Sequence, residues 1–274
     1  MKKIISLILA LTLGLTAMFA LSSCGATATK VAVQKGTTSK MYADILKGVE
    51  TVSYDTFALA ANDMKNGNAA YVFVDKTTAN ALCKEISGLK VIDIALSSEN
   101  YGIGIDPAQT DLKAKIDGIL ESEAAAIDAI KTKYMDGNED AYVGVASATQ
   151  DDSKKDTQLV VATNAEFAPW EYKEGELYYG IDMEIAKLIA DKLEMELVIK
   201  HMDFDVVVSS VGKHNVDIAM SGITITTERL EVINFSNPYY TESIVVVCKA
   251  DDTSLDSAGT VVDILNTICA VEAE

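Results

Sequence analysis

The stretch D-I-A-M-S-G-I-T-I-T-T-E-R, residues 217–229, decides how the rest of the sequence is interpreted. Its first part is typical of a short buried strand followed by a turn, and the hydroxyls from Thr226 onward are typical of a helix N-terminus. This places Arg229 one turn inside a helix, beside free backbone N–H groups. Because a guanidinium binds a carboxylate through two parallel hydrogen bonds, we predict a carboxylate site completed by the N–H groups of residues 222–224 and by the Thr224 hydroxyl. The alternative is that Arg229 only pairs with a surface glutamate.

Strands alternate with helices upstream of this stretch at a spacing typical of an α/β layer architecture. We expect strands at residues 30–33, 52–54, 69–74, 91–95 and 101–105, and helices at 40–46, 56–66, 77–86 and within 110–135. Asp75 follows the third strand, at the carboxyl end where open α/β sheets place ligands. The alternative is that Asp75 caps the helix that follows.

Composition limits the possible partners. The chain has 274 residues, 49% of them hydrophobic, which is enough for one large domain or for two lobes. Its net charge is −18, and removing residues 1–23 would take away two lysines and leave −20. Such an acidic protein is a poor partner for nucleic acid or for anionic lipid.

The N-terminus has the plan of a secretory signal, with M-K-K followed by the apolar run 4–20. The sequence L-S-S-C-G at 21–25 resembles a lipobox, in which cleavage before Cys24 is coupled to lipid attachment. We therefore expect a lipoprotein signal peptide at residues 1–23 and an anchor that tethers the protein to the outer face of the membrane. The alternatives are an ordinary signal peptide with an incidental cysteine, or an uncleaved anchor.

The remaining cysteines, Cys83, Cys248 and Cys269, lack the spacing of a metal site. The chain has only two histidines, so we expect neither a metal, nor another cofactor, nor histidine-based catalysis. Cys248 follows three valines in an apolar strand, where a small buried hydrophobic residue is expected.

Several separated segments resemble the polar amino acid solute-binding proteins that feed ABC importers, which have the two-lobed type II periplasmic-binding-protein fold. Besides 217–229, the segments are T-N-A-E-F-A-P-W-E-Y at 163–172, G-I-D at 180–182, F-S-N-P-Y-Y at 235–240 and V-A-V-Q-K-G-T-T-S at 31–39. Together they cover most of residues 30–250. The resemblance implies an α/β protein in which lobe 1 carries Arg229 and lobe 2 carries Asp75. It also implies closure of the lobes on a free amino acid, which an importer permease then receives.

Carried over residue by residue, the resemblance assigns roles at both ends of the ligand. Arg229 and Thr224, helped by Thr37 and Thr38, would hold the carboxylate, and Asp75 with the carbonyl of Gly222 would hold the ammonium. The side chain of the ligand would lie between Phe167 and Phe204, with Asn164 and Gln34 or Ser39 as polar selectors. Because Asn164 is neutral where a cationic ligand would require a carboxylate, we expect a neutral polar amino acid such as glutamine.

The order of the segments is rotated relative to the family, since the strand with which the family normally begins appears only at residue 159. A circular permutation explains this order, because the old ends lie on one lobe and a polar linker can join them. We expect a signal peptide at 1–23, lobe 2 at 24–100, a crossing strand and closing helices packed on lobe 1 at 101–137, a linker at 138–157, lobe 1 at 158–250, and a tail at 251–274. The tail would be a short amphipathic helix or a frayed end. The protein would be a monomer, with a swapped dimer as the alternative.

Three other functions stay open at this stage. A secreted dehydratase-like enzyme would need a general acid or base in the cleft, and neither histidine falls in a ligand motif. A membrane sensor would need a spanning segment and an output domain, which we do not find after residue 250. An inactive, rearranged remnant would not bind amino acids at all.

Overall fold

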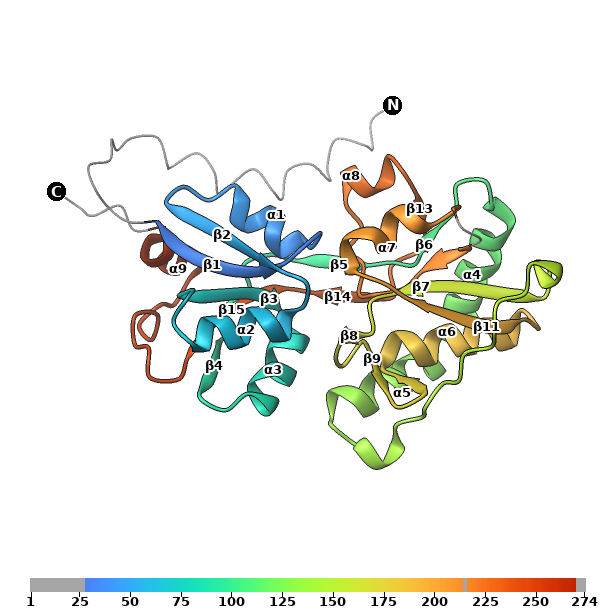
Figure 1. The fold of residues 1–274 in the computed structure, drawn as a ribbon, viewed down its shortest axis with the longest axis horizontal. Helices are drawn as coiled ribbons and strands as arrows, with labels where there is room; N and C mark the ends of the chain where they lie inside the picture. The colour runs from blue at the N-terminus through green and yellow to red at the C-terminus, as the bar shows by residue number, and fades with distance from the viewer. Residues whose placement is uncertain (1–27, 214–215, 270–274) are drawn as a thin grey trace.

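The computed structural model describes residues 28–213 and 216–269. The predicted signal peptide at 1–23 and the lipid-bearing Cys24 lie outside the described residues. Figure 1 shows two α/β lobes side by side, with strands that run from one lobe into the other. Within the described part of the chain, no helix has the length and apolar character needed to cross a membrane.

Lobe 2 is built on a five-stranded sheet with the order β2-β1-β3-β15-β4. Its strands are β1 (Thr29–Gln34), β2 (Val49–Tyr54), β3 (Tyr71–Asp75), β4 (Leu89–Ile92) and β15 (Ile244–Lys249). The first three run parallel, and β15 is antiparallel to both of its neighbours. The helices are α1 (Thr38–Asp44), α2 (Phe57–Lys65) and α3 (Lys76–Glu85). Thr37 and Thr56 cap the first two helices through their hydroxyls.

Lobe 1 is built on a second five-stranded sheet with the order β11-β7-β12-β6-β13. Its strands are β6 (Gly104–Ile105), β7 (Gln158–Thr163), β11 (Glu196–His201), β12 (Ile218–Ala219) and β13 (Asn234–Phe235). Its helices are α4 (Thr110–Ser122), α5 (Ala124–Met135), α6 (Ile181–Lys192), α7 (Phe204–Ser210) and α8 (Thr227–Leu230). A small sheet of β8 (Glu166–Phe167), β9 (Glu171–Glu174) and β10 (Leu177–Tyr179) lies beside them.

Each large sheet contains one strand from the other half of the chain. β15 comes from the late half and pairs in lobe 2, whereas β6 comes from the early half and pairs in lobe 1. Between the lobes, β5 (Glu99–Tyr101) and β14 (Tyr240–Glu242) form an antiparallel pair. The boundary that the sequence placed at residue 250 therefore lies near residue 243, because β15 is not part of lobe 1. The core of each lobe is complete only when both halves of the chain contribute.

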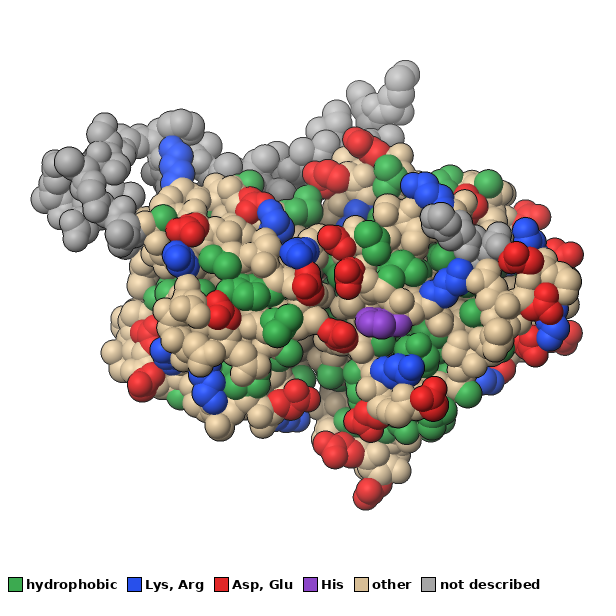
Figure 2. All heavy atoms as spheres, viewed as in Figure 1, with side chains coloured by type: hydrophobic (Ala, Val, Ile, Leu, Met, Phe, Trp, Pro, Cys, Tyr) green, Lys and Arg blue, Asp and Glu red, His purple; other side chains and the backbone are tan. Residues whose placement is uncertain are grey.

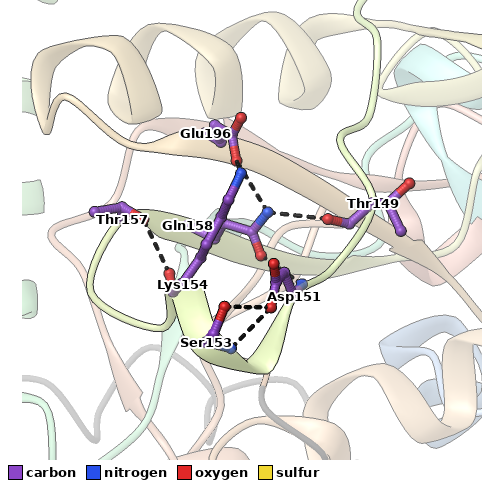
Figure 3. A network of polar contacts seen from close by, with 7 residues as sticks. All are labelled: Thr149, Asp151, Ser153, Lys154, Thr157, Gln158 and Glu196. Atoms are coloured by element: carbon purple, nitrogen blue, oxygen red, sulfur yellow. Dashed lines mark hydrogen bonds and ion pairs between the residues drawn. The ribbon is translucent and has the colours of Figure 1, made fainter.

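The segment 138–157, expected to be a polar linker, follows the surface of lobe 1 through specific hydrogen bonds. Figure 3 shows its end, where Gln158 donates to the carbonyl of Thr149 and to Glu196, and Lys154 forms an ion pair with Glu196. Two short 3-10 turns, η1 (Glu139–Ala141) and η2 (Asp152–Lys154), shape the segment. The polar side chains of this segment thus form local hydrogen bonds along lobe 1.

The tail forms the helix α9 (Val261–Ile268), which begins with a capping box made by Thr260 and Asp263. Ile264 and Ile268 are fully buried in the core of lobe 2, on the same sheet face as α1. The structure therefore confirms a packed amphipathic helix rather than a frayed end.

Candidate functional site

A narrow cleft lies between the lobes, with about 270 Å³ of space including its opening. Most of the predicted site residues line it, although they come from opposite ends of the chain. Lobe 2 contributes Gln34, Thr37, Thr38, Phe57 and Asp75, and lobe 1 contributes Phe167, Phe204, Ser221, Gly222, Thr224 and Arg229. On the face seen in Figure 2, acidic side chains gather along the line where the lobes meet.

Arg229 lies in α8, and the capping hydroxyl of Thr226 accepts a hydrogen bond from its backbone N–H. Its side chain is 8% exposed. Nη1 donates to the carbonyl of Thr224 at 2.7 Å, and Nη2 donates to the carbonyl of Gly36, on the other lobe, at 3.0 Å. The guanidinium also lies over the Phe204 ring at 5.7 Å. The alternative of a surface ion pair is therefore wrong.

The guanidinium of Arg229 has hydrogen-bond donors left for a ligand. A guanidinium has five N–H donors, and two of them make the bonds to described residues given above. Burial lowers the pKa of Arg229, and the nearby charges of Glu99 and Asp75 oppose that shift. A buried cation with unengaged donors beside a cleft is suited to an anionic group.

Asp75 stands at the end of β3 and at the first capping position of α3, but its side chain makes no capping bond. Glu242, from β14, instead accepts from the backbone N–H of Thr77 at 3.2 Å, so it occupies that role. The capping alternative for Asp75 is therefore wrong. Asp75 is 6% exposed, and its burial, together with the charges of Glu99 and Glu242, holds its pKa well above the usual range.

The three threonines of the cleft have their hydroxyl protons committed within the protein. Thr37 donates to the carbonyl of Gln34 at 2.7 Å while it caps α1. Thr38 and Thr224 donate to the same oxygen of Glu99, at 2.7 and 2.6 Å. The sequence analysis had assigned the Thr224 hydroxyl to a ligand carboxylate, helped by Thr37 and Thr38. That assignment stays a prediction, and the structure identifies Glu99 as a residue that the sequence analysis missed.

Residues 159–270 match the bacterial extracellular solute-binding proteins, family 3. Over these residues the chain is similar to this family. It is 36% identical over 108 residues to the arginine-binding extracellular protein ArtP of Bacillus subtilis, which is 39% of this chain and 42% of that protein. It is 34% identical over 88 residues to a probable histidine-binding protein of Neisseria gonorrhoeae, which is 32% of this chain and 33% of that protein.

A solved structure matches a similar share of the chain. The arginine-bound form of domain 1 from TmArgBP is 30% identical, with 45% of this chain and 100% of that domain covered and a TM-score of 0.31. The chain thus spans about two fifths of the length of the curated relatives it matches. These relatives are named as binding proteins. Among the described residues, the one histidine, His201, does not line the cleft.

Gly222 lies in a backbone conformation and at a close contact that only glycine fits without strain. Its φ of +53° is in the left-handed region, and an added Cβ would lie 2.8 Å from the Phe167 ring. Its N–H donates to Asp182 at 2.8 Å, so it is not available for the ligand carboxylate to which the sequence had assigned it. Burial raises the pKa of Asp182 to about 6, against the bonds from Gly222 and Tyr239. The neighbouring Ser221 donates to the fully buried Glu171.

The side-chain pocket is partly closed by contacts between the lobes. Gln34 donates to the side-chain oxygen of Asn164 at 3.0 Å, so these two predicted selectors bind one another across the cleft. Phe57, which the sequence analysis missed, packs against Phe167 with ring centroids 5.7 Å apart. Ser39 is fully buried and is not part of the cleft lining, and its hydroxyl has no hydrogen-bond partner among the described residues.

Trp170, the only tryptophan of the sequence, lies where the lobes meet. Its indole N–H donates across the lobe boundary to the Thr77 hydroxyl at 2.8 Å. Its ring packs edge-on against Tyr101 and Tyr240 of the two bridging strands. Movement of the lobes would change this environment, so the fluorescence of Trp170 should change when the lobes move. Within residues 28–213 and 216–269, no group of His, Cys, Asp and Glu side chains is arranged to hold a metal ion.

Proposed function

We propose that this protein captures a free amino acid between its two lobes and delivers it to an ABC importer. One observation carries the proposal: a buried guanidinium with unengaged donors in lobe 1 and a buried carboxyl without a capping bond in lobe 2 line the same cleft. An α-amino acid carries the two opposite charges that these groups need. Closure of the lobes around it would be favoured because Arg229 and Asp75 then both bind the ligand.

Two classes of ligand side chain fit different features of the cleft. The neutral Asn164 favours a neutral polar amino acid such as glutamine. The buried carboxyl groups of Asp75, Glu99 and Glu242 outnumber the single buried guanidinium of Arg229 around the cleft, which favours a ligand with an additional positive charge. The relatives named as arginine- and histidine-binding proteins support this second class.

Titration calorimetry with glutamine, arginine, histidine and cystine tests the proposal directly. A working site should bind at least one of them with a dissociation constant of about 1 µM or lower, which corresponds to roughly −8 kcal/mol. The fluorescence of Trp170 should change with the same midpoint, because lobe closure alters its surroundings. The absence of binding for all twenty amino acids would contradict the proposal and would favour an inactive remnant.

We further propose that Cys24 carries a lipid anchor and that the protein works on the outer face of the cell membrane. The names of the relatives support an extracytoplasmic location, since they are described as extracellular or periplasmic proteins. Mass spectrometry of the membrane-bound protein would test the anchor: the expected mass includes a lipid on a mature chain that begins at Cys24.

We also propose that the order of the chain is a circular permutation of the family order. The family match that begins at residue 159 supports this, as does the exchange of β15 and β6 between the lobes. Residues near both ends of the described chain meet in lobe 2, where the N–H of Thr29 donates to the carbonyl of Gly48 at 2.8 Å. The carbonyl of Cys269 approaches the same glycine, 3.1 Å from the position of an added Cβ. A short connection could therefore join these ends.

A further inference from the structure

A hydrogen bond between the lobes is made by two residues that do not line the cleft. The indole N–H of Trp170, in lobe 1, donates to the hydroxyl of Thr77, in α3 of lobe 2, at 2.8 Å. Trp170 is fully buried. The bonds that Gln34 and Arg229 make to the opposite lobe come from residues that do line the cleft, so a ligand can contact those residues directly. The bond from Trp170 to Thr77 is thus separate from the candidate ligand site.

Each end of this bond is held by further hydrogen bonds. In lobe 1, the backbone N–H of Trp170 donates to the carbonyl of Phe167 at 2.9 Å, and the carbonyl of Trp170 accepts from the N–H of Asp182 at 2.8 Å. On the other side, Glu242 of β14 accepts from the Thr77 hydroxyl at 2.5 Å and from its backbone N–H at 3.2 Å. Because a threonine hydroxyl has a single proton, Thr77 offers a lone pair to the indole. Both partners are therefore fixed before they meet.

The indole ring also packs against the strands that join the lobes. Its centroid lies 4.9 Å from that of Tyr101 on β5 and 4.7 Å from that of Tyr240 on β14, both in edge-on contacts. These contacts leave the indole little freedom to follow Thr77 if the lobes move apart. A hydrogen bond of 2.8 Å is lost beyond about 3.5 Å, so a separation of less than about 1 Å at this point breaks it.

We propose that Trp170 and Thr77 form a latch between the lobes, which slows their opening and so prolongs the residence of a bound ligand that neither residue contacts. The inference rests on the proposed function and adds two positioning residues to it. A ligand enclosed between two lobes leaves after they separate, so each release event includes breaking the latch. Loss of the latch should therefore raise the dissociation rate of every ligand by the same factor.

The first test is Thr77→Val, which keeps the shape of the side chain and removes the hydroxyl that accepts from the indole. The dissociation rate is measured by chasing the bound, radiolabelled amino acid with unlabelled ligand. It should rise about fivefold, the value of an ordinary hydrogen bond. Thr77→Ser restores the hydroxyl and should keep the wild-type rate. Thr78→Val is the matched control, because Thr78 is the next residue of α3, is 3% exposed, and its hydroxyl has no hydrogen-bond partner among the described residues.

The second test removes the same bond from the opposite lobe. Trp170→Phe keeps an aromatic ring but lacks the N–H, and it should also raise the dissociation rate about fivefold. The double variant with Thr77→Val should release ligand no faster than either single variant, since both changes delete one and the same interaction. Effects that multiply in the double variant would show that the two residues act independently, and this would overturn the latch.

The outcomes separate this inference from the proposed function. A dissociation rate that rises in Thr77→Val and Trp170→Phe, but not in Thr77→Ser or Thr78→Val, supports the latch. Wild-type binding with an unchanged dissociation rate in the first two variants overturns the inference alone, even if their melting temperatures fall, because the bond would then serve stability only. Failure of the wild type to bind any amino acid would overturn the proposed function and the inference with it.

Discussion

Carbonyl and carboxyl groups near Arg229 in lobe 1 favour its charge against the effect of burial, whereas burial and the carboxyl groups of Glu99 and Glu242 oppose the charge of Asp75 in lobe 2. Two carbonyl groups and the Phe204 ring contact the guanidinium, and the nearest charges are carboxyl groups. Asp75 is buried among the like charges of Glu99 and Glu242. Arg229 and Asp75 therefore need different groups from a ligand: an anionic group for the guanidinium and a cationic group for the carboxyl. Arg229 is already satisfied in part, but Asp75 lacks a cation that the ligand must supply.

The strongest test of this contrast is the pair of variants Asp75→Asn and Arg229→Ala. Both should weaken amino acid binding about a hundredfold or more, because each leaves one charge of the ligand buried without a partner. Calorimetry measures this loss. A loss below about fivefold in either variant would contradict the placement of that pole.

The same two variants should change the stability of the ligand-free protein in opposite directions. Arg229→Ala leaves the carbonyls of Thr224 and Gly36 without their donor and should lower the free energy of unfolding by about 2–3 kcal/mol. Asp75→Asn removes a carboxyl group whose charge is opposed by its surroundings and should raise the free energy of unfolding by about 1–2 kcal/mol, or roughly 2–8 °C in the melting temperature. Thermal unfolding at pH 7 measures both.

The gain from Asp75→Asn should depend on pH with a definite sign. The folded-state pKa of Asp75 is raised, so the wild-type carboxyl lowers stability above its unfolded pKa of about 4. The gain should therefore be present at pH 7 and vanish as the pH falls to about 4. Equal stabilisation at both values would show that the charge of Asp75 is not the cause.

Ligand binding should release a proton from the Asp75 pole. An ammonium pairs only with the ionised carboxyl, so affinity should rise with pH, by up to about tenfold per pH unit below the pKa of Asp75. Calorimetry in two buffers with different ionisation enthalpies detects the released proton. Arg229→Ala should keep this proton release at the ligand concentrations where it still binds, whereas Asp75→Asn should lose it.

Gly222→Ala should weaken binding about tenfold, because a Cβ would push against Phe167 and the left-handed backbone would be strained. Gly175→Ala is a matched control, since Gly175 has a φ of +58° but open space around its Cβ position. That control separates backbone strain from close approach to the cleft. Equal affinity of the two variants would contradict the role of Gly222 as a site of close approach.

The smallest effect should come from reordering the chain. A gene encoding residues 138–269, a short glycine-serine linker and then residues 28–137 restores the proposed family order and moves the ends into the segment after α5. Both poles stay in place, so affinity should remain within about threefold of wild type. Unfolding of the reordered protein, or loss of binding with the fold intact, would contradict the proposed permutation.

Much of the site could be predicted because its signals are local. Asp75 follows an apolar strand, and Arg229 follows the hydroxyls of a helix N-terminus, so each position could be inferred from its neighbours. Glu99 could not, because its partners Thr38 and Thr224 lie 61 and 125 residues away. Nor could the capping of α3 by Glu242, which is 165 residues from Thr77.

The fold shows the same division between local and distant signals. Alternating strands and helices predicted the α/β lobes, since each element depends on its own pattern. The place of β15 in lobe 2 depends on pairing with β3 and β4, far earlier in the chain. The segment 138–157 has the composition of a flexible linker, and only its contacts with Glu196 and Tyr178 reveal that it packs on lobe 1.

A crystal structure with the best-binding amino acid tests the central claim most directly. The account predicts the ligand carboxylate within hydrogen-bonding distance of the Arg229 guanidinium and the ammonium beside Asp75, with both lobes closed on the same molecule. A ligand bound in the reverse orientation, held by one lobe alone, or bound outside this cleft would contradict it.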